Sequence, residues 1–121
     1  MRKPACTIRI VTAFSPGRLA QKSTETADLL VASGSPWVAR HGVVAIVTPN
    51  VRDLAIALLA RPGARLTVHD LVERVYAFDE DGGPLDAPAA IRRTIYDLRS
   101  LGPALGIRLQ AIGYQYEAML A

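Results

Sequence analysis

Apolar residues recur with helical spacing in the middle of the chain, which predicts a first long helix there. Five of them fall on one side of a helix that begins at Pro49: Val51, Leu54, Ala55, Leu58 and Leu59. Thr48 is a good N-cap, and Pro49 suits the first helical position because its missing N–H would have no partner there. The run Arg61-Pro62-Gly63 is expected to end this helix.

Two further helices are predicted downstream. Thr67 with Asp70 three residues later resembles a capping box, which starts the second helix. Its apolar face consists of Leu71, Val72 and Val75. The third helix is expected over residues 86–101, with Pro88 in its first turn, and it should end before Gly102-Pro103 because proline disrupts a helix interior. Its apolar side chains share one arc: Ile91, Thr94, Ile95, Leu98 and Leu101.

Short segments with alternating polarity predict strands at both ends of the chain. Residues 7–14 alternate and form a first candidate strand. Residues 37–40 and 43–47 predict two strands joined at His41-Gly42, where glycine supplies the permissive turn backbone. Residues 107–119 alternate around Gly113, which predicts a closing β-hairpin.

The other N-terminal residues are expected to form a turn, a loop and one short helix. Ser15-Pro16-Gly17 is a turn signal, and residues 18–26 are polar, as in an exposed loop. Residues 25–33 predict the short helix, because Thr24 can cap it and Gly34 can end it. Its apolar face would consist of Ala27, Leu30 and Val31.

The third helix has a polar face that suits DNA. Opposite its apolar arc, with Arg99 at the edge, lie four polar side chains: Arg92, Arg93, Tyr96 and Ser100. Arginine can bind guanine or phosphate with two hydrogen bonds, tyrosine can bind a phosphate, and serine permits close approach. Asp97 lies beside this face, where it would repel phosphates or pair with Arg93. An ordinary solvent-exposed helix face is the alternative interpretation, since outward arginines are common on amphipathic helices.

The net charge of +3 is unevenly distributed along the chain. Residues 1–47 hold six Arg or Lys and two acids, a charge of +4, whereas residues 48–121 hold eight Arg and nine acids, a charge of −1. Attraction to phosphates must therefore come from local clusters or from the N-terminal segment. Arg108, just inside the last hairpin, can contact phosphates or the minor groove. A solvent-facing strand residue is the alternative interpretation of Arg108.

Catalytic and metal chemistry find little support in the sequence. His41 lies in an expected turn and His69 in the first turn of a helix, and neither has a partner at catalytic or metal-binding spacing. Cys6 is the only cysteine, so no internal disulfide can form and structural zinc lacks ligands. We therefore expect no enzyme, no cofactor and no metal. No apolar run approaches about 18 residues and no signal peptide is recognisable, so a cytoplasmic protein without membrane contact is expected.

In their order, these segments resemble the OmpR/PhoB-type winged helix-turn-helix effector domain of bacterial response regulators, over about residues 37–119. The family's Leu-Thr-Pro helix start is matched by Val47-Thr48-Pro49, and its helix stop by Pro62-Gly63. Its capped second helix, which ends in Val-Trp or Val-Tyr, is matched by residues 67–76. Leu98-Arg99 matches the end of its recognition helix, and Gly113-Tyr114 the end of its wing.

The resemblance implies an α+β fold with an N-terminal antiparallel β-sheet, a three-helix core and a C-terminal β-hairpin wing. Residues 37–121 would form the winged helix-turn-helix and residues 1–36 an N-terminal strand and extension, in one compact domain overall. The resemblance also implies that the loop between the second and third helices touches RNA polymerase. Asp79, Glu80 and Asp81 of this loop suit a basic partner surface. An acidic loop that only keeps the surface polar is the alternative.

The chain departs from the family pattern at three points. About forty residues precede the resembling part, too few for a receiver domain with its phosphorylatable Asp, so a stand-alone regulator is expected. Tyr96-Asp97 stand where the family's helix often has basic residues. Residues 110–112, Gln-Ala-Ile, stand where its wing commonly has an arginine. The last two departures remove positive charge from the expected contact surfaces.

The leading hypothesis is a sequence-specific transcriptional regulator whose third helix reads the major groove of double-stranded DNA, with Arg99 and Arg108 helping to position it. Because a single half-site gives modest affinity, a homodimer through the N-terminal sheet or helix would strengthen binding. The alternative hypothesis is a winged-helix interaction module that binds RNA polymerase or another regulator and has little or no DNA affinity. The charge of −1 over residues 48–121 and the presence of Asp97 favour this alternative.

Overall fold

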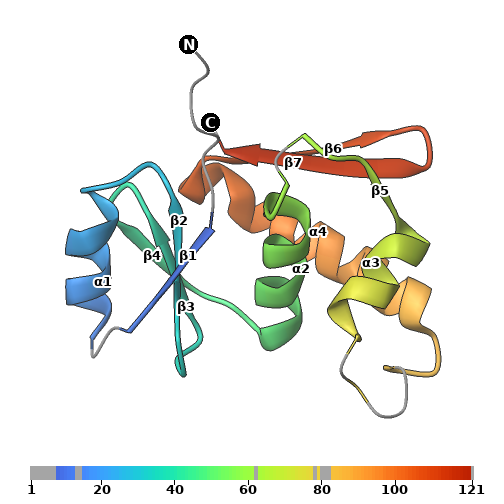
Figure 1. Ribbon diagram of the computed structural model, residues 1–121, viewed down its shortest axis with the longest axis horizontal. Helices are drawn as coiled ribbons and strands as arrows, with labels where there is room; N and C mark the ends of the chain where they lie inside the picture. The colour runs from blue at the N-terminus through green and yellow to red at the C-terminus, as the bar shows by residue number, and fades with distance from the viewer. Residues whose placement is uncertain (1–7, 13–14, 62, 78, 80–82, 121) are drawn as a thin grey trace.

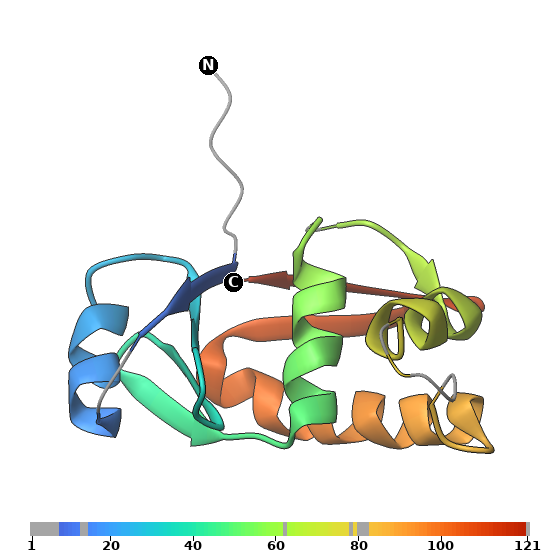
Figure 2. The same cartoon turned by 60° about the horizontal axis from the view of Figure 1, so that its bottom comes forward.

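The computed structural model describes residues 8–12, 15–61, 63–77, 79 and 83–120. Within these ranges the chain forms two small sheets and a group of helices between and beside them (Figures 1 and 2). The helices are α1 (Pro16–Ser23), α2 (Pro49–Leu59), α3 (Val68–Val75) and α4 (Ala87–Leu105). The strands are β1 (Ile8–Val11), β2 (Leu29–Ala32), β3 (Trp37–Arg40), β4 (Val43–Ile46), β5 (Leu66–Thr67), β6 (Ile107–Ile112) and β7 (Gln115–Leu120).

The N-terminal sheet has the strand order β1-β2-β3-β4 and is mixed rather than antiparallel. β1 pairs with β2 in parallel, with Ile8 opposite Leu29, while the other neighbours are antiparallel. The prediction of a purely antiparallel sheet is therefore wrong. The reason is α1: two parallel strands need a crossover between them, and α1 provides it. The predicted strand pair at residues 37–47 is confirmed, with His41 and Gly42 at the turn in positive φ.

The predicted loop at residues 18–26 is wrong, because α1 occupies residues 16–23. Ser15 caps this helix by accepting a 3.2 Å hydrogen bond from the N–H of Arg18, and Pro16 begins it. Leu19 anchors α1 on the sheet and is fully buried. Thr24 follows the end of α1, where its hydroxyl donates to the carbonyl of Gln21 at 2.7 Å. The turn signal at residues 15–17 was thus the start of a helix.

The predicted helix at residues 25–33 is also wrong, because this segment contains β2. All four residues of β2 are buried, since α1 covers one face of the sheet and the main helical core covers the other. A strand buried on both faces shows a continuous apolar run instead of alternation. Thr24 is therefore the C-cap of α1 rather than the N-cap of a helix, and Gly34 lies in the turn between β2 and β3.

The helix starts in the second half agree with the predictions. Thr48 caps α2, and Thr67 and Asp70 form the predicted capping box of α3. Asp86 caps α4 by accepting from the N–H of Ala89 at 3.2 Å. The five predicted stripe residues of α2 are all buried: Val51, Leu54, Ala55, Leu58 and Leu59. They pack against α4 in the main core.

The predicted end of α4 is wrong, because the helix continues through Gly102 and Pro103 to Leu105. Pro103 removes one backbone hydrogen bond, a loss that usually costs about 3 kcal/mol in a helix interior. Leu105 is fully buried, and its burial offsets much of this loss. Gly106 then ends α4 in the left-handed conformation, with φ of 67°.

The C-terminal hairpin is confirmed and turns at Gly113, which has φ of 62°. Its strands β6 and β7 pair along their whole length, and β5 adds to the outer side of β7 in the order β5-β7-β6. The hairpin runs along the helices, and the N-terminal sheet lies at the other end of the molecule (Figures 1 and 2). The described residues therefore form an α+β fold whose core lies between the helices and both sheets.

Candidate nucleic-acid interface

The polar face predicted for α4 is exposed along its length. Arg92, Arg93, Arg99 and Ser100 are exposed, and Tyr96 has 69% of its surface accessible. We call these five polar side chains the α4 face. The opposite side of α4 is buried and contains Ile91, Thr94, Ile95 and Leu98, so the buried and exposed sides are those that the periodicity predicted. No strand of either sheet covers the α4 face, within the residues that are described.

Hydrogen bonds within α4 keep its two faces distinct. The buried hydroxyl of Thr94 donates to the carbonyl of Ala90 at 2.9 Å, so it needs no partner in the core. Ser100 donates to the carbonyl of Tyr96 at 3.1 Å, which folds its hydroxyl back onto the helix. The direct donors that remain on the α4 face are therefore the guanidinium groups and the phenol of Tyr96.

The positive charges of the α4 face are not neutralised by any acidic residue in the described part of the chain. Arg92, Arg93 and Arg99 form no ion pair with any residue in the described ranges. The pairing of Arg93 with Asp97 considered from the sequence is not formed, although Asp97 is exposed on the same helix. An unpaired arginine keeps all of its donors for an external phosphate or base. Asp97 is the one feature of this helix surface that opposes an anionic ligand.

Arg108 lies close to the C-terminal end of the α4 face. Arg99 of α4 and Arg108 of β6 line the same groove, whose volume is about 510 Å³. The floor between them consists of the helix end and the first residues of β6: Pro103, Gly106, Ile107, Leu109 and Gln110. The structure thus brings together two residues that the sequence placed in separate elements. The groove itself was not predicted, because the expected helix stopped before Pro103.

The hairpin carries one negative charge near this groove, and this carboxylate already has partners within the protein. Glu117 of β7 accepts a 2.7 Å hydrogen bond from the side chain of Gln110. Its carboxylate also lies 3.7 Å from Arg65. Glu117 is therefore partly neutralised, which leaves Arg108 as the exposed charge of β6. Tyr114 at the hairpin tip is 92% exposed.

The acidic loop before α4 is described only in part. Asp79 is exposed, whereas Glu80 and Asp81 lie outside the described residues. Tyr76 at the start of the loop is buried, and this burial, together with the charge of Asp79, raises the pKa of its phenol. The ring packs against Gly83, where a β-carbon would lie 2.6 Å from its Cγ. This glycine contact was not visible in the sequence pattern.

Other chemistry is sparse in the described part of the chain. His69 lies 3.2 Å from Glu73 on the exposed side of α3, an ordinary pair one helical turn apart. No group of three His, Cys, Asp or Glu side chains that could hold a metal ion is found among the described residues. No helix in those ranges is both long and apolar enough to cross a membrane.

Comparison with known proteins gives no family assignment. No protein-family model matches the chain, and no curated protein is significantly similar to it. Any function must therefore be argued from the geometry of the α4 face and its surroundings.

Proposed function

We propose that this protein is a DNA-binding transcriptional regulator of the winged helix-turn-helix type, similar to the OmpR/PhoB effector domains. In this proposal α2 and α3 support α4, α4 enters the major groove, and the β6–β7 hairpin is the wing. The observation that carries the proposal is the exposure of an α4 face whose three arginines have no internal ion pair among the described residues.

Two arginines at the end of α4 and on β6 extend the proposed contact surface. Arg99 and Arg108 line one groove, so a phosphate of the duplex backbone can bind both while Arg92 and Arg93 reach the bases. Tyr96 would add a hydrogen bond to a phosphate. Asp97 requires that the duplex approach from the arginine side of the helix, since its charge repels phosphates.

The test is a fluorescence-anisotropy titration of the full chain with random and selected duplexes at several salt concentrations. We expect log K to fall by about 0.9 per log unit of salt for each phosphate contacted. The double variant Arg92→Ala/Arg93→Ala should weaken binding strongly. A matched control, Arg18→Ala/Lys22→Ala, removes the same charge from α1 and should bind within about two-fold of the wild type, since α1 lies outside the proposed surface. Equal losses in both variants would refute the role of α4.

The second candidate function is a protein-interaction module with little or no DNA affinity. The exposed Asp97, without an ion pair among the described residues, favours it because an anion on a recognition helix opposes DNA. Its partners would be RNA polymerase or another regulator, with Asp79 of the acidic loop as one contact. The absence of DNA binding at low salt, with the chain folded, would select this candidate.

A further inference from the structure

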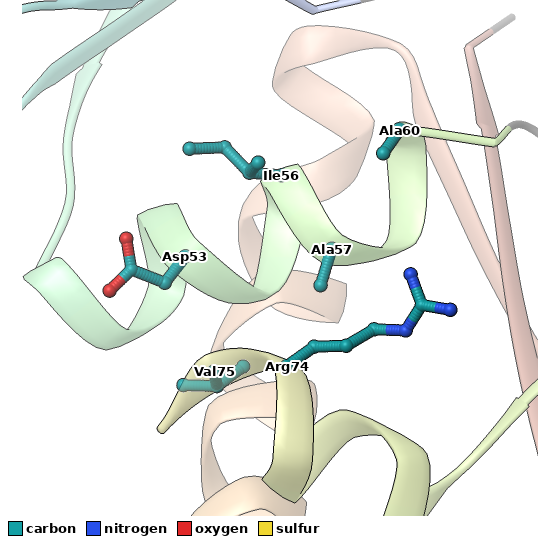
Figure 3. A pocket seen from close by; sticks show the side chains of 6 residues that line it. All are labelled: Asp53, Ile56, Ala57, Ala60, Arg74 and Val75. Carbon is teal, nitrogen blue, oxygen red and sulfur yellow. The ribbon is translucent and has the colours of Figure 1, made fainter. Parts of the chain in front are cut away.

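The outer side of α2 forms an apolar groove with α3. Ile56 and Ala57 of α2, Ala60 at its C-cap and Val75 of α3 line this groove, which has a volume of about 340 Å³ (Figure 3). Ile56 also lines a neighbouring hollow with Ile10, whose side chain is 65% exposed. Ile56 therefore belongs to both hollows, and the second one is also lined by Ser33 and Arg52.

Two charged side chains mark opposite ends of the α2–α3 groove. Asp53 lies at one end, and the side chain of Arg74 runs along the wall toward Ala60 at the other (Figure 3). Asp53 is matched by Arg52, whose Nε lies 3.4 Å from its carboxylate. Arg74 is exposed and forms no ion pair with any described residue. Among the described lining residues, Arg74 is therefore the charged side chain without an ion-pair partner within 4 Å.

We propose that the α2–α3 groove binds a segment of a partner protein that presents an apolar anchor side chain followed by an Asp or Glu. The anchor would pack against Ile56, Ala57 and Val75, since removal of apolar surface from water drives such docking. The carboxylate would pair with Arg74 and fix the direction of the segment. A nucleic acid fits this groove poorly, because the walls are mainly apolar and Arg74 is the one basic side chain among the described lining residues.

The α2–α3 groove is independent of the α4 face. The buried stripe of α2 packs against α4, and the groove residues lie on the opposite side of α2. The arginines of α4 likewise face away from α2, which lies in front of α4 in Figure 1. A protein segment in the groove and a duplex on α4 would therefore contact opposite sides of the molecule. The proposal stands whether or not the chain binds DNA.

The experiment is a display selection of random peptides of about 12 residues, enough for about three helical turns, against the full chain. Selected peptides should contain an apolar residue with a nearby Asp or Glu. Arg74→Glu should lower the affinity of these peptides by about two- to five-fold or more, since one exposed ion pair contributes roughly a two- to five-fold change. A new selection on Arg74→Glu should replace the acidic residue by a basic one. The matched control Arg18→Glu makes the same charge change on α1 and should leave the affinities unchanged.

A second variant blocks the apolar wall. Ala57→Glu places a charge among the groove side chains and should abolish peptide binding, with folding checked by circular dichroism. Since Arg74 is exposed, Arg74→Glu remains informative even if Ala57→Glu does not fold. The proposal is overturned if no peptide is enriched, or if selected peptides bind Arg74→Glu as tightly as the wild type. It is also overturned if sedimentation shows a dimer that Ala57→Glu dissociates, because a second copy would then fill the groove.

Discussion

Arg40 of β3 donates a 3.2 Å hydrogen bond from Nη1 to the carbonyl of Leu105, 65 residues later, at the end of α4. The same nitrogen donates to Gly106 at 3.2 Å, and Nε donates to the carbonyl of Ala27 at 2.8 Å. Arg40 is only 1% exposed. The last carbonyls of a helix have no internal partners and carry partial negative charge, so a buried cation stabilises them. Arg40 therefore ties the N-terminal sheet to the C-terminal end of α4.

Replacement of Arg40 by methionine should destabilise the fold. Arg40→Met keeps an unbranched apolar stem, two atoms shorter than arginine, but leaves three buried or half-buried carbonyls without their donor, a loss of about 3 kcal/mol in the free energy of unfolding. Urea unfolding followed by circular dichroism measures this value. The exposed Arg18 provides the comparison, since Arg18→Met should change stability by less than about 0.5 kcal/mol. Similar values for the two variants would show that the Arg40 bonds contribute little.

Gly102 is expected to tolerate no side chain. A β-carbon on this residue would lie 2.7 Å from the carbonyl oxygen of Ile107, so Gly102→Ala must shift α4 against β6. We expect Gly102→Ala to lower the free energy of unfolding by about 1–3 kcal/mol, although the better helix propensity of alanine offsets part of this loss. Gly17→Ala in α1 meets no atom within 4 Å and should stabilise by up to about 1 kcal/mol. Thermal unfolding should therefore move the two Tm values in opposite directions, and shifts of the same sign would contradict this explanation.

The capping box of α3 should make stability depend on pH at the acidic end. The backbone N–H of Thr67 donates to the carboxylate of Asp70 at 2.9 Å, and this bond is the main reason why the pKa of the Asp70 carboxyl is lowered from its ordinary value. A hydrogen bond with the Thr67 side chain lowers this pKa further. The pKa of Asp70 is lower in the folded chain than in the unfolded chain. Its contribution to stability is therefore fully present above the unfolded-state pKa and is lost as the pH falls through the folded-state pKa. Asp70→Asn should flatten the stability profile in that window, measured by unfolding between about pH 2.5 and about pH 6. An unchanged stability profile in Asp70→Asn would count against the capping box.

The helix starts and the hairpin of the second half could be predicted because their signals are local. The cap at Thr48 and the box at Thr67 and Asp70 depend only on residues within one helical turn. The segment over residues 25–33 could not be predicted, because β2 is buried on both faces by elements distant in sequence. A run of four apolar residues is as typical of a buried helix segment as of a buried strand, and the neighbouring residues do not distinguish the two structures.

The candidate site was predictable to the same limited extent. The exposure of Arg92 and Arg93 follows from helical periodicity alone, once the apolar arc of α4 is recognised. The groove between Arg99 and Arg108 depends on where α4 ends. That end is decided by the burial of Leu105 against the rest of the core, a tertiary effect that outweighs the local signal of Pro103.

The groove between α4 and β6 leads to a final prediction, which depends on the proposed DNA binding. If one phosphate lies between Arg99 and Arg108, Arg108→Ala should weaken all duplexes about equally and reduce the salt slope by at most about 0.9, the value of one phosphate. Arg99→Ala should do the same, and the double variant should cost less than the two single losses combined, because both side chains hold one phosphate. By contrast, Arg92→Ala should change the preferred sequence. Anisotropy titrations over a salt series distinguish these cases, and fully additive losses at Arg99 and Arg108 would mean that they contact separate phosphates.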